Sequence, residues 1–116
     1  MKEIKAVIRP SKLSALRDAL MALPGFPGMT VTKVEGCSAP VRHIPAKVRI
    51  RDELTDYTAK VRVEIVAADE VAGGIYECIS QVARTGSLGD GLVWVTPVEE
   101  ASFVFKSMSG DDPIAG

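Results

Sequence analysis

The amino-acid sequence predicts an α+β domain in which a β-α-β unit is followed by a long loop and a second β-α-β unit. Two features indicate this class. Short segments that alternate apolar and polar residues are typical of strands whose two faces meet different surroundings, and two segments of helical period lie between them. The chain has 116 residues, of which 47% are apolar and 25% charged. This is the size and balance of a single globular domain over residues 1–116.

The first β-α-β unit opens with a strand over residues 4–10, where apolar and charged side chains alternate. Ser11 is a good N-cap for a helix that is predicted to run to about Leu23. Prolines and glycines then interrupt the chain. A second strand over residues 29–35 completes the unit and is predicted to end at Gly36.

Residues 37–58 form the predicted long loop, because they show no single period and contain prolines and many charges. A loop of this length inside a compact domain is commonly functional or disordered. Within it, residues 47–51 alternate like a strand and could extend as an arm. From the residues alone, a solvated hairpin extension and a functional loop both remain open.

The second half repeats the pattern and adds a short strand. Its predicted elements are a strand over residues 59–67, a helix from 68 or 69 to about 84, a tight glycine-rich loop over 86–91, a strand over 92–96, a fifth strand over 102–106 and a mobile polar tail over 107–116. This order is that of the ferredoxin-like split βαβ sandwich. Helices are expected on one face of the sheet. The other face, exposed and partly apolar, favours assembly into a closed homo-oligomer.

Composition argues against several classes of protein. The formal net charge of −1 is unlike that of a nucleic-acid binder, which usually carries an excess of basic residues. No apolar run approaches the roughly 20 residues of a membrane span, and residues 1–5 lack the apolar start of a secretory signal. We therefore expect a cytoplasmic protein without membrane insertion. Two cysteines are too few for a disulfide framework, and Cys78, in an apolar helical stretch, is expected in the core.

Five segments together resemble one known family. They are KEIKAVIRPSKL at residues 2–13, GMTVTKVEG at 28–36, KVRVEIV at 60–66, ARTGSLGDG at 83–91 and PVE at 97–99. In this order and spacing they are similar to the strands and the glycine-rich loop of the nitrogen regulatory PII signalling proteins. The resemblance implies a homotrimer that is not an enzyme. It also implies control of a partner enzyme, transporter or regulator through the long loop, which is called the T-loop in that family.

The resemblance further implies a ligand site. PII proteins bind ATP or ADP in clefts between subunits, often together with 2-oxoglutarate. When the nucleotide contacts of the family are transferred residue by residue to this sequence, the residues around an adenine nucleotide are Thr30, Gly36, Val66, Thr85, Gly89, Asp90 and Gly91. Glycines suit such a loop because they let backbone N–H groups approach phosphate oxygens closely. Lys60 matches the family lysine that pairs with the 2-oxoglutarate carboxylate.

The sequence departs from the family at three positions that hold phosphates. Leu92 stands where the family has a lysine, and Phe103 and Phe105 stand where it has two arginines. Charge-assisted hydrogen bonds contribute about 1.5–3 kcal/mol each, so phosphate binding is expected to be weakened or altered. ADP, AMP and ATP all remain candidate ligands. Lys106, Arg9 and Lys60 are cations that could replace the missing contacts.

The long loop also departs from the family pattern. Ala39 and Pro40 replace an arginine and a glutamine that help to hold ATP and 2-oxoglutarate, so the oxoacid site is not expected to form. The family's modified tyrosine lies near the loop tip, whereas Tyr57 lies near the end of this loop. Uridylylation is therefore not expected.

Two other regulatory functions remain open. One is a metal-responsive binding module of the kind associated with cation efflux. Cys37 and His43 are its weak candidate ligands, because thiolate and imidazole suit soft or borderline metals. A surface histidine and a packed, buried cysteine are the simpler interpretation. The other is an inorganic-carbon-linked regulator without ATP binding. An acylphosphatase-like enzyme of the same fold would need an asparagine, and the chain contains none.

Overall fold

The computed structural model of the chain describes residues 1–37 and 57–106. Their elements, in chain order, are β1 (Lys2–Ile8), the 3₁₀ turn η1 (Pro10–Lys12), α1 (Leu13–Met21), β2 (Thr30–Gly36), β3 (Thr58–Ala67), α3 (Asp69–Ala83), β4 (Leu92–Pro97) and the 3₁₀ turn η2 (Val104–Lys106). The predicted order of two β-α-β units is confirmed. The expectations for Ala39, Pro40, His43 and the segments 47–51 and 107–116 lie outside the described residues.

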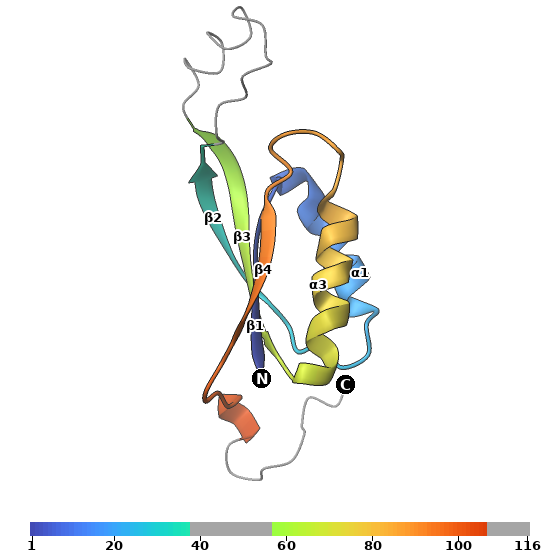
Figure 1. The fold of residues 1–116 in the computed structure, drawn as a ribbon, viewed down its shortest axis with the longest axis vertical. Coiled ribbons are helices and arrows are strands. Elements are labelled where there is room, and N and C mark those ends of the chain that lie inside the picture. The colour runs from blue at the N-terminus through green and yellow to red at the C-terminus, as the bar shows by residue number, and fades with distance from the viewer. Residues whose placement is uncertain (38–56, 107–116) are drawn as a thin grey trace, which may run out of the picture.

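One antiparallel sheet holds the four strands in the order β2-β3-β1-β4. Both helices cover the same face of this sheet (Figure 1). The register places Ile4 of β1 opposite Ile65 of β3 and Val95 of β4, and residues directly opposite one another share a face. The arrangement is that of the ferredoxin-like split βαβ fold.

The core lies between the helices and the sheet. Its buried side chains are those of Ile4, Ala6, Ile8, Val61, Val63, Ile65 and Ala67 from the strands and of Leu16, Leu20, Ala72, Ile75, Ile79 and Ala83 from the helices. Every second residue of β1 from Ile4 and of β3 from Val61 is buried, so the predicted alternation of these strands is confirmed. Cys78 is half-buried against this core, which meets the expectation for it only in part.

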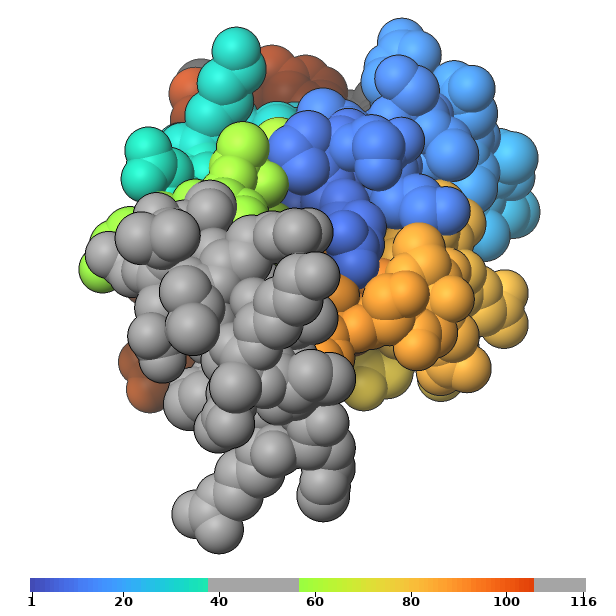
Figure 2. All heavy atoms as spheres, turned by 90° about the horizontal axis from the view of Figure 1, so that it is seen from above, coloured from blue at the N-terminus to red at the C-terminus, as the bar shows by residue number. Residues whose placement is uncertain are grey.

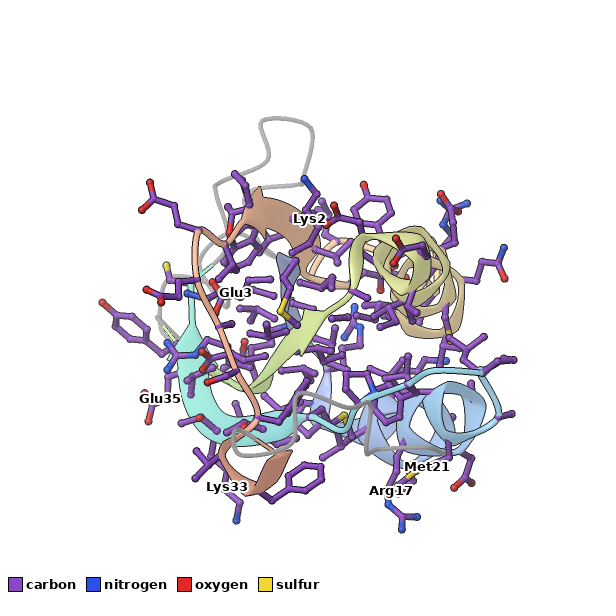
Figure 3. All side chains as sticks on the ribbon, turned by 90° about the horizontal axis from the view of Figure 1, so that it is seen from below. Lys2, Glu3, Arg17, Met21, Lys33 and Glu35 are labelled. Atoms are coloured by element: carbon purple, nitrogen blue, oxygen red, sulfur yellow. The ribbon has the colours of Figure 1, made fainter. Side chains whose placement is uncertain are left out.

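The uncovered face of the sheet carries several charged side chains. Lys5 of β1 lies opposite Glu64 of β3. Lys5 Nζ is 3.6 Å from Glu3 Oε1, and Arg62 Nε is 3.2 Å from Glu64 Oε1. In Figure 3, Glu3 lies on the side of the sheet away from α1. Over β1 and β3 this face therefore carries charged side chains together with those of Val7 and Val66, and it is partly apolar, as the sequence predicted.

The predicted fifth strand over residues 102–106 is wrong. Residues 102 and 103 form no regular element, and Val104–Lys106 form η2. A Phe-Val-Phe segment favours a strand only where a neighbouring strand offers backbone partners. In β4, Pro97 lies opposite Lys2 at the very start of β1, so the chain beyond it has passed the end of its neighbour. In the described part of the chain, no other strand lies there to pair with it.

The start of the first helix also differs from the prediction. Ser11 lies inside η1 and is not an N-cap, while α1 begins at Leu13 and ends at Met21. Pro10 fixes its own φ near about −65° and suits the first position of a helical turn, so the 3₁₀ turn takes the place of the first turn of the helix. The other elements begin and end within two residues of their predicted limits. Among the described residues, no helix has the length and apolar character that crossing a bilayer requires.

Candidate functional site

The loop that joins α3 to β4, residues 84–91, is built around the carboxylate of Asp90. The backbone N–H groups of Thr85 and Gly86 donate to Asp90 Oδ2 at 2.7 and 2.9 Å, and the Thr85 hydroxyl donates to Oδ1. These hydrogen bonds, first that of the Thr85 hydroxyl, hold the pKa of Asp90 well below its usual range. Hydrogen bonds to the ionised form of a carboxyl group stabilise that form. Asp90 therefore stays ionised, and its carboxylate links the end of the loop to its start at Thr85 and Gly86.

Two cations from the sheet hold the same loop. Arg9, just beyond β1, donates through Nε to Asp90 Oδ1 at 3.2 Å and through Nη2 to the carbonyl of Leu88 at 2.7 Å. Lys60 of β3 donates through Nζ to the carbonyl of Gly89. Figure 2 views this end of the molecule, where residues near the N-terminal end of the chain, in blue, lie beside the loop, in orange. Two of the cations that could replace the missing phosphate contacts, Arg9 and Lys60, therefore donate to the loop itself.

Lys60 is buried, with only 8% of its surface exposed, although lysine is seldom buried. Its stem packs beside Gly36, because a Cβ added to Gly36 would lie 3.2 Å from Lys60 Cγ. Within the part of the chain that is described, no carboxylate lies in ion-pair range of Lys60. The pairing of Lys60 with an oxoacid carboxylate stays a prediction.

The glycines of the loop are required by the backbone. Gly89 and Gly91 have φ angles of 90° and 98°, in the region that side chains disfavour. A Cβ added to Gly91 would lie 1.7 Å from the carbonyl oxygen of Val7, because the chain passes against β1 there. Gly91 is thus needed for packing of the chain, whether or not a ligand binds.

Thr30 and Val66 lie on the wall of a groove of about 590 Å³. Thr30 is opposite Glu64 and Val66 is opposite Glu3, and both carboxylates also line the groove. The remaining lining residues are Met1, Pro27, Gly28, Met29, Ala101, Ser102 and Phe103. Sequence reasoning missed Glu3 and Glu64, because only the register of the strands brings them there. No lysine or arginine is among the described lining residues, so the groove offers hydrogen-bond acceptors and apolar surface but no side-chain cation.

The predicted site residues therefore fall into two groups. Gly36, Lys60 and the loop 84–91 lie together, whereas Thr30 and Val66 lie at the groove. β2 runs from Thr30 to Gly36, and six steps along a strand span roughly 20 Å. One chain does not bring the whole predicted set together.

Apolar side chains occupy the three positions where phosphate-binding cations were to be expected. Leu92, which follows the loop, has 59% of its surface exposed. Phe103 lines the groove, and its ring centroid is 6.4 Å from that of Phe105. Leu92 also borders a crevice of about 190 Å³ beneath the loop. The structure thus places apolar surface at both groups of the predicted site.

Of the two weak metal candidates, only Cys37 lies in the described part of the chain. Cys37, which directly follows β2, is exposed, so the expectation of buried packing is wrong. The reason is that β2 is an edge strand and the helices cover other parts of the sheet (Figure 1). His43 lies outside the described residues. Among those described, no group of three histidine, cysteine, aspartate or glutamate side chains could hold a metal ion.

Comparison with known proteins agrees with the fold. A family model described as Nitrogen regulatory protein P-II matches residues 1–107. The chain is 38% identical to the Nitrogen regulatory protein P-II of Rhizobium meliloti (strain 1021) and 37% identical to that of Azospirillum brasilense. Each alignment spans 114 residues, which cover 98% of this chain and 100% of the relative. The Nitrogen regulatory protein P-II 2 of Methanothermobacter thermautotrophicus is 40% identical over 110 residues, covering 95% of this chain and 94% of that protein.

Proposed function

Because the chain belongs to the nitrogen regulatory protein P-II family, we propose that it is a cytoplasmic signal-transduction regulator that controls a partner protein through residues 37–58. We propose no catalytic activity. The polar groups of the loop 84–91 support this choice, since Asp90, Arg9 and Lys60 all hold the loop itself.

The assembly that we propose is a homotrimer. The observation that carries the proposal is the separation of the predicted ligand residues into two groups. A head-to-tail contact between copies would place the groove with Thr30 and Val66 beside the Gly36 end of a second copy. Contacts of this kind close into a ring when the rotation between copies allows it, and the family resemblance favours three copies.

The ligand that we propose is an adenine nucleotide, held more by its base and ribose than by its phosphates. Thr30 and Val66 supply a polar and an apolar contact on the groove wall. The loop supplies glycines, but Leu92 and Phe105 replace cations, and Arg9 and Lys60 are bonded to loop carbonyls. Successive phosphates should therefore add little to the affinity, so ATP, ADP and AMP should bind with similar dissociation constants.

Light scattering and calorimetry test these two proposals separately. Light scattering in solution should give three times the mass of the chain, and a monomer at micromolar concentration would overturn the assembly. Calorimetric titration should give dissociation constants for ATP, ADP and AMP within about tenfold of one another, because no phosphate gains a cationic partner. Absence of binding by all three, or ATP binding a hundredfold tighter than AMP, would reject the proposed ligand mode.

Neither alternative regulatory function gains support. A metal-responsive module would need ligands that converge, and the described residues contain no group of three histidine, cysteine, aspartate or glutamate side chains that could hold a metal ion. An inorganic-carbon-linked regulator is not favoured by any feature of the fold or of the site. The PII-type regulator therefore stands as the proposal.

A further inference from the structure

Two exposed apolar features lie at opposite ends of β4. Beyond its end, Val104 and Phe105 of η2 have 87% and 65% of their surfaces exposed. We call the segment of Phe103, Val104 and Phe105 the apolar knob. At its start, Leu92 is exposed beside the loop 84–91. Single surface hydrophobics are ordinary, but a contiguous apolar group often marks an interaction site.

The crevice beneath the loop matches the knob in size and chemistry. It holds about 190 Å³ and is lined by Ile8, Ile79, Ser80, Ala83, Arg84, Asp90, Gly91, Leu92 and Val93. We call it the loop crevice. Five of these side chains are aliphatic, and an apolar cavity of roughly 150 Å³ is enough to accept benzene. A single phenylalanine ring would therefore fill most of the loop crevice.

Charges beside the two features are complementary. Arg84 on the rim of the loop crevice is exposed, as are Glu99 and Glu100 in the segment that leads to the knob. None of the three forms an ion pair with another described residue. Contact between the knob and the loop crevice would therefore pair the Arg84 guanidinium with a carboxylate, and this pair would help to fix the relative orientation of the two surfaces.

The knob cannot reach the loop crevice of its own chain. Leu92 lies opposite Val7 and Pro97 lies opposite Lys2, so β4 holds the two features apart along the whole length of β1. Five steps along a strand span roughly 17 Å, and η2 lies further still beyond the end of the sheet (Figure 1). An occupant from this protein must come from a second copy.

We propose that Phe105 of one copy inserts into the loop crevice of a second copy, between its α3 and its β4. This inference rests on the proposed head-to-tail assembly and names the contact that holds it together. An apolar side chain, that of Phe105, then makes the contact from a position where the resemblance led us to expect a cation. The contact between copies needs no nucleotide, so the assembly should form equally in the presence and in the absence of ATP.

Substitution of the knob tests the contact. Phe105→Asp should raise the dissociation constant of the assembly by about tenfold or more, which is the loss typical of a buried interface anchor. Its matched control is Met21→Asp, since Met21 has 60% of its surface exposed and projects from α1 (Figure 3). The control should leave the assembly unchanged. Far-ultraviolet circular dichroism checks that both variants fold, as expected for exposed positions.

Cross-linking gives an independent readout. In chains carrying Cys37→Ser and Cys78→Ala, Phe105→Cys in one population and Ser80→Cys in another should link through a short bis-maleimide after the two are refolded together. Arg17→Cys in place of Ser80→Cys should not link. If the native protein is an oligomer but Phe105→Asp leaves it intact and no link forms, this inference falls while the proposed assembly stands. A monomeric native protein overturns both.

Discussion

Gly91 occupies a place where the backbone leaves no room for any side chain. Gly91→Ala would bring a Cβ to 1.7 Å from the Val7 carbonyl oxygen at a φ of 98°, so the loop or β1 must move. We expect a loss of about 3 kcal/mol or more in the free energy of unfolding, measured by urea titration. Gly86→Ala is the matched control, because Gly86 has a φ of 87° but nothing within 4 Å of the added Cβ. It should cost only about 1–2 kcal/mol. Equal losses in the two variants would contradict the clash.

Asp90 makes the stability of its loop depend on pH. Its folded-state pKa is lowered, chiefly by the hydrogen bond from the Thr85 hydroxyl. A carboxylate with a lowered pKa contributes stability that is present above its unfolded pKa, about 3.9, and is lost progressively as the pH falls below that value. Asp90→Asn should therefore speed amide hydrogen exchange at Thr85 and Gly86 at pH 7. The difference between variant and native protein should shrink below about pH 4. A difference that is constant from pH 7 to pH 3 would show that Asp90 does not act through its charge.

At the scale of elements, the loop 84–91 depends on two neighbouring strands. Arg9 beyond β1 and Lys60 in β3 donate to successive carbonyls, those of Leu88 and Gly89. Arg9→Met or Lys60→Met should loosen the loop without unfolding the core, and trypsin should then cleave faster after Arg84. Because both cations hold the same loop, the double variant should depart from additivity. Arg17→Met on α1 is the control, and it should leave this cleavage rate unchanged.

The elements that could be predicted are those whose signal is local. Ile4 in β1 and Val63 in β3 belong to short alternating runs, and a strand with one covered face produces that pattern wherever it pairs. The segment from Phe103 to Phe105 has equally strong strand propensity. Yet Phe103 lies outside any regular element and Val104 begins η2, because no strand in the described part of the chain extends to pair with it. Ser11 has the side chain of an N-cap, but the adjacent Pro10 starts a 3₁₀ turn. The local propensity of a segment predicts its structure only where the adjacent residues and the neighbouring strands favour the same structure.

At the scale of the whole molecule, the parts of the site that escaped prediction come from distant contacts. The bond from Arg9 to Asp90 joins residues 81 positions apart, and that from Lys60 to Gly89 joins residues 29 apart. No local pattern contains such pairs. The glycine-rich loop could be predicted from its own residues and from their resemblance to the corresponding loop of the PII family. The separation of Thr30 from Gly36 follows instead from the length of β2 and its antiparallel register, and it is the reason why a second copy enters the proposal.

Restoring the cations should convert the molecule into one whose assembly responds to ATP. The variant Leu92→Lys, Phe103→Arg, Phe105→Arg places three charges where the family has them. Each charge-assisted contact contributes about 1.5–3 kcal/mol, and because neighbouring contacts are not additive, we expect a gain of about tenfold to a thousandfold in ATP affinity. The same change removes the apolar knob, so without ATP the variant should dissociate, and with ATP it should assemble. Calorimetry and light scattering, each with and without ATP, measure the two effects. A variant with Met21→Lys controls for added charge elsewhere. If the triple variant assembled equally well without ATP, the apolar knob would not be what holds the native copies together.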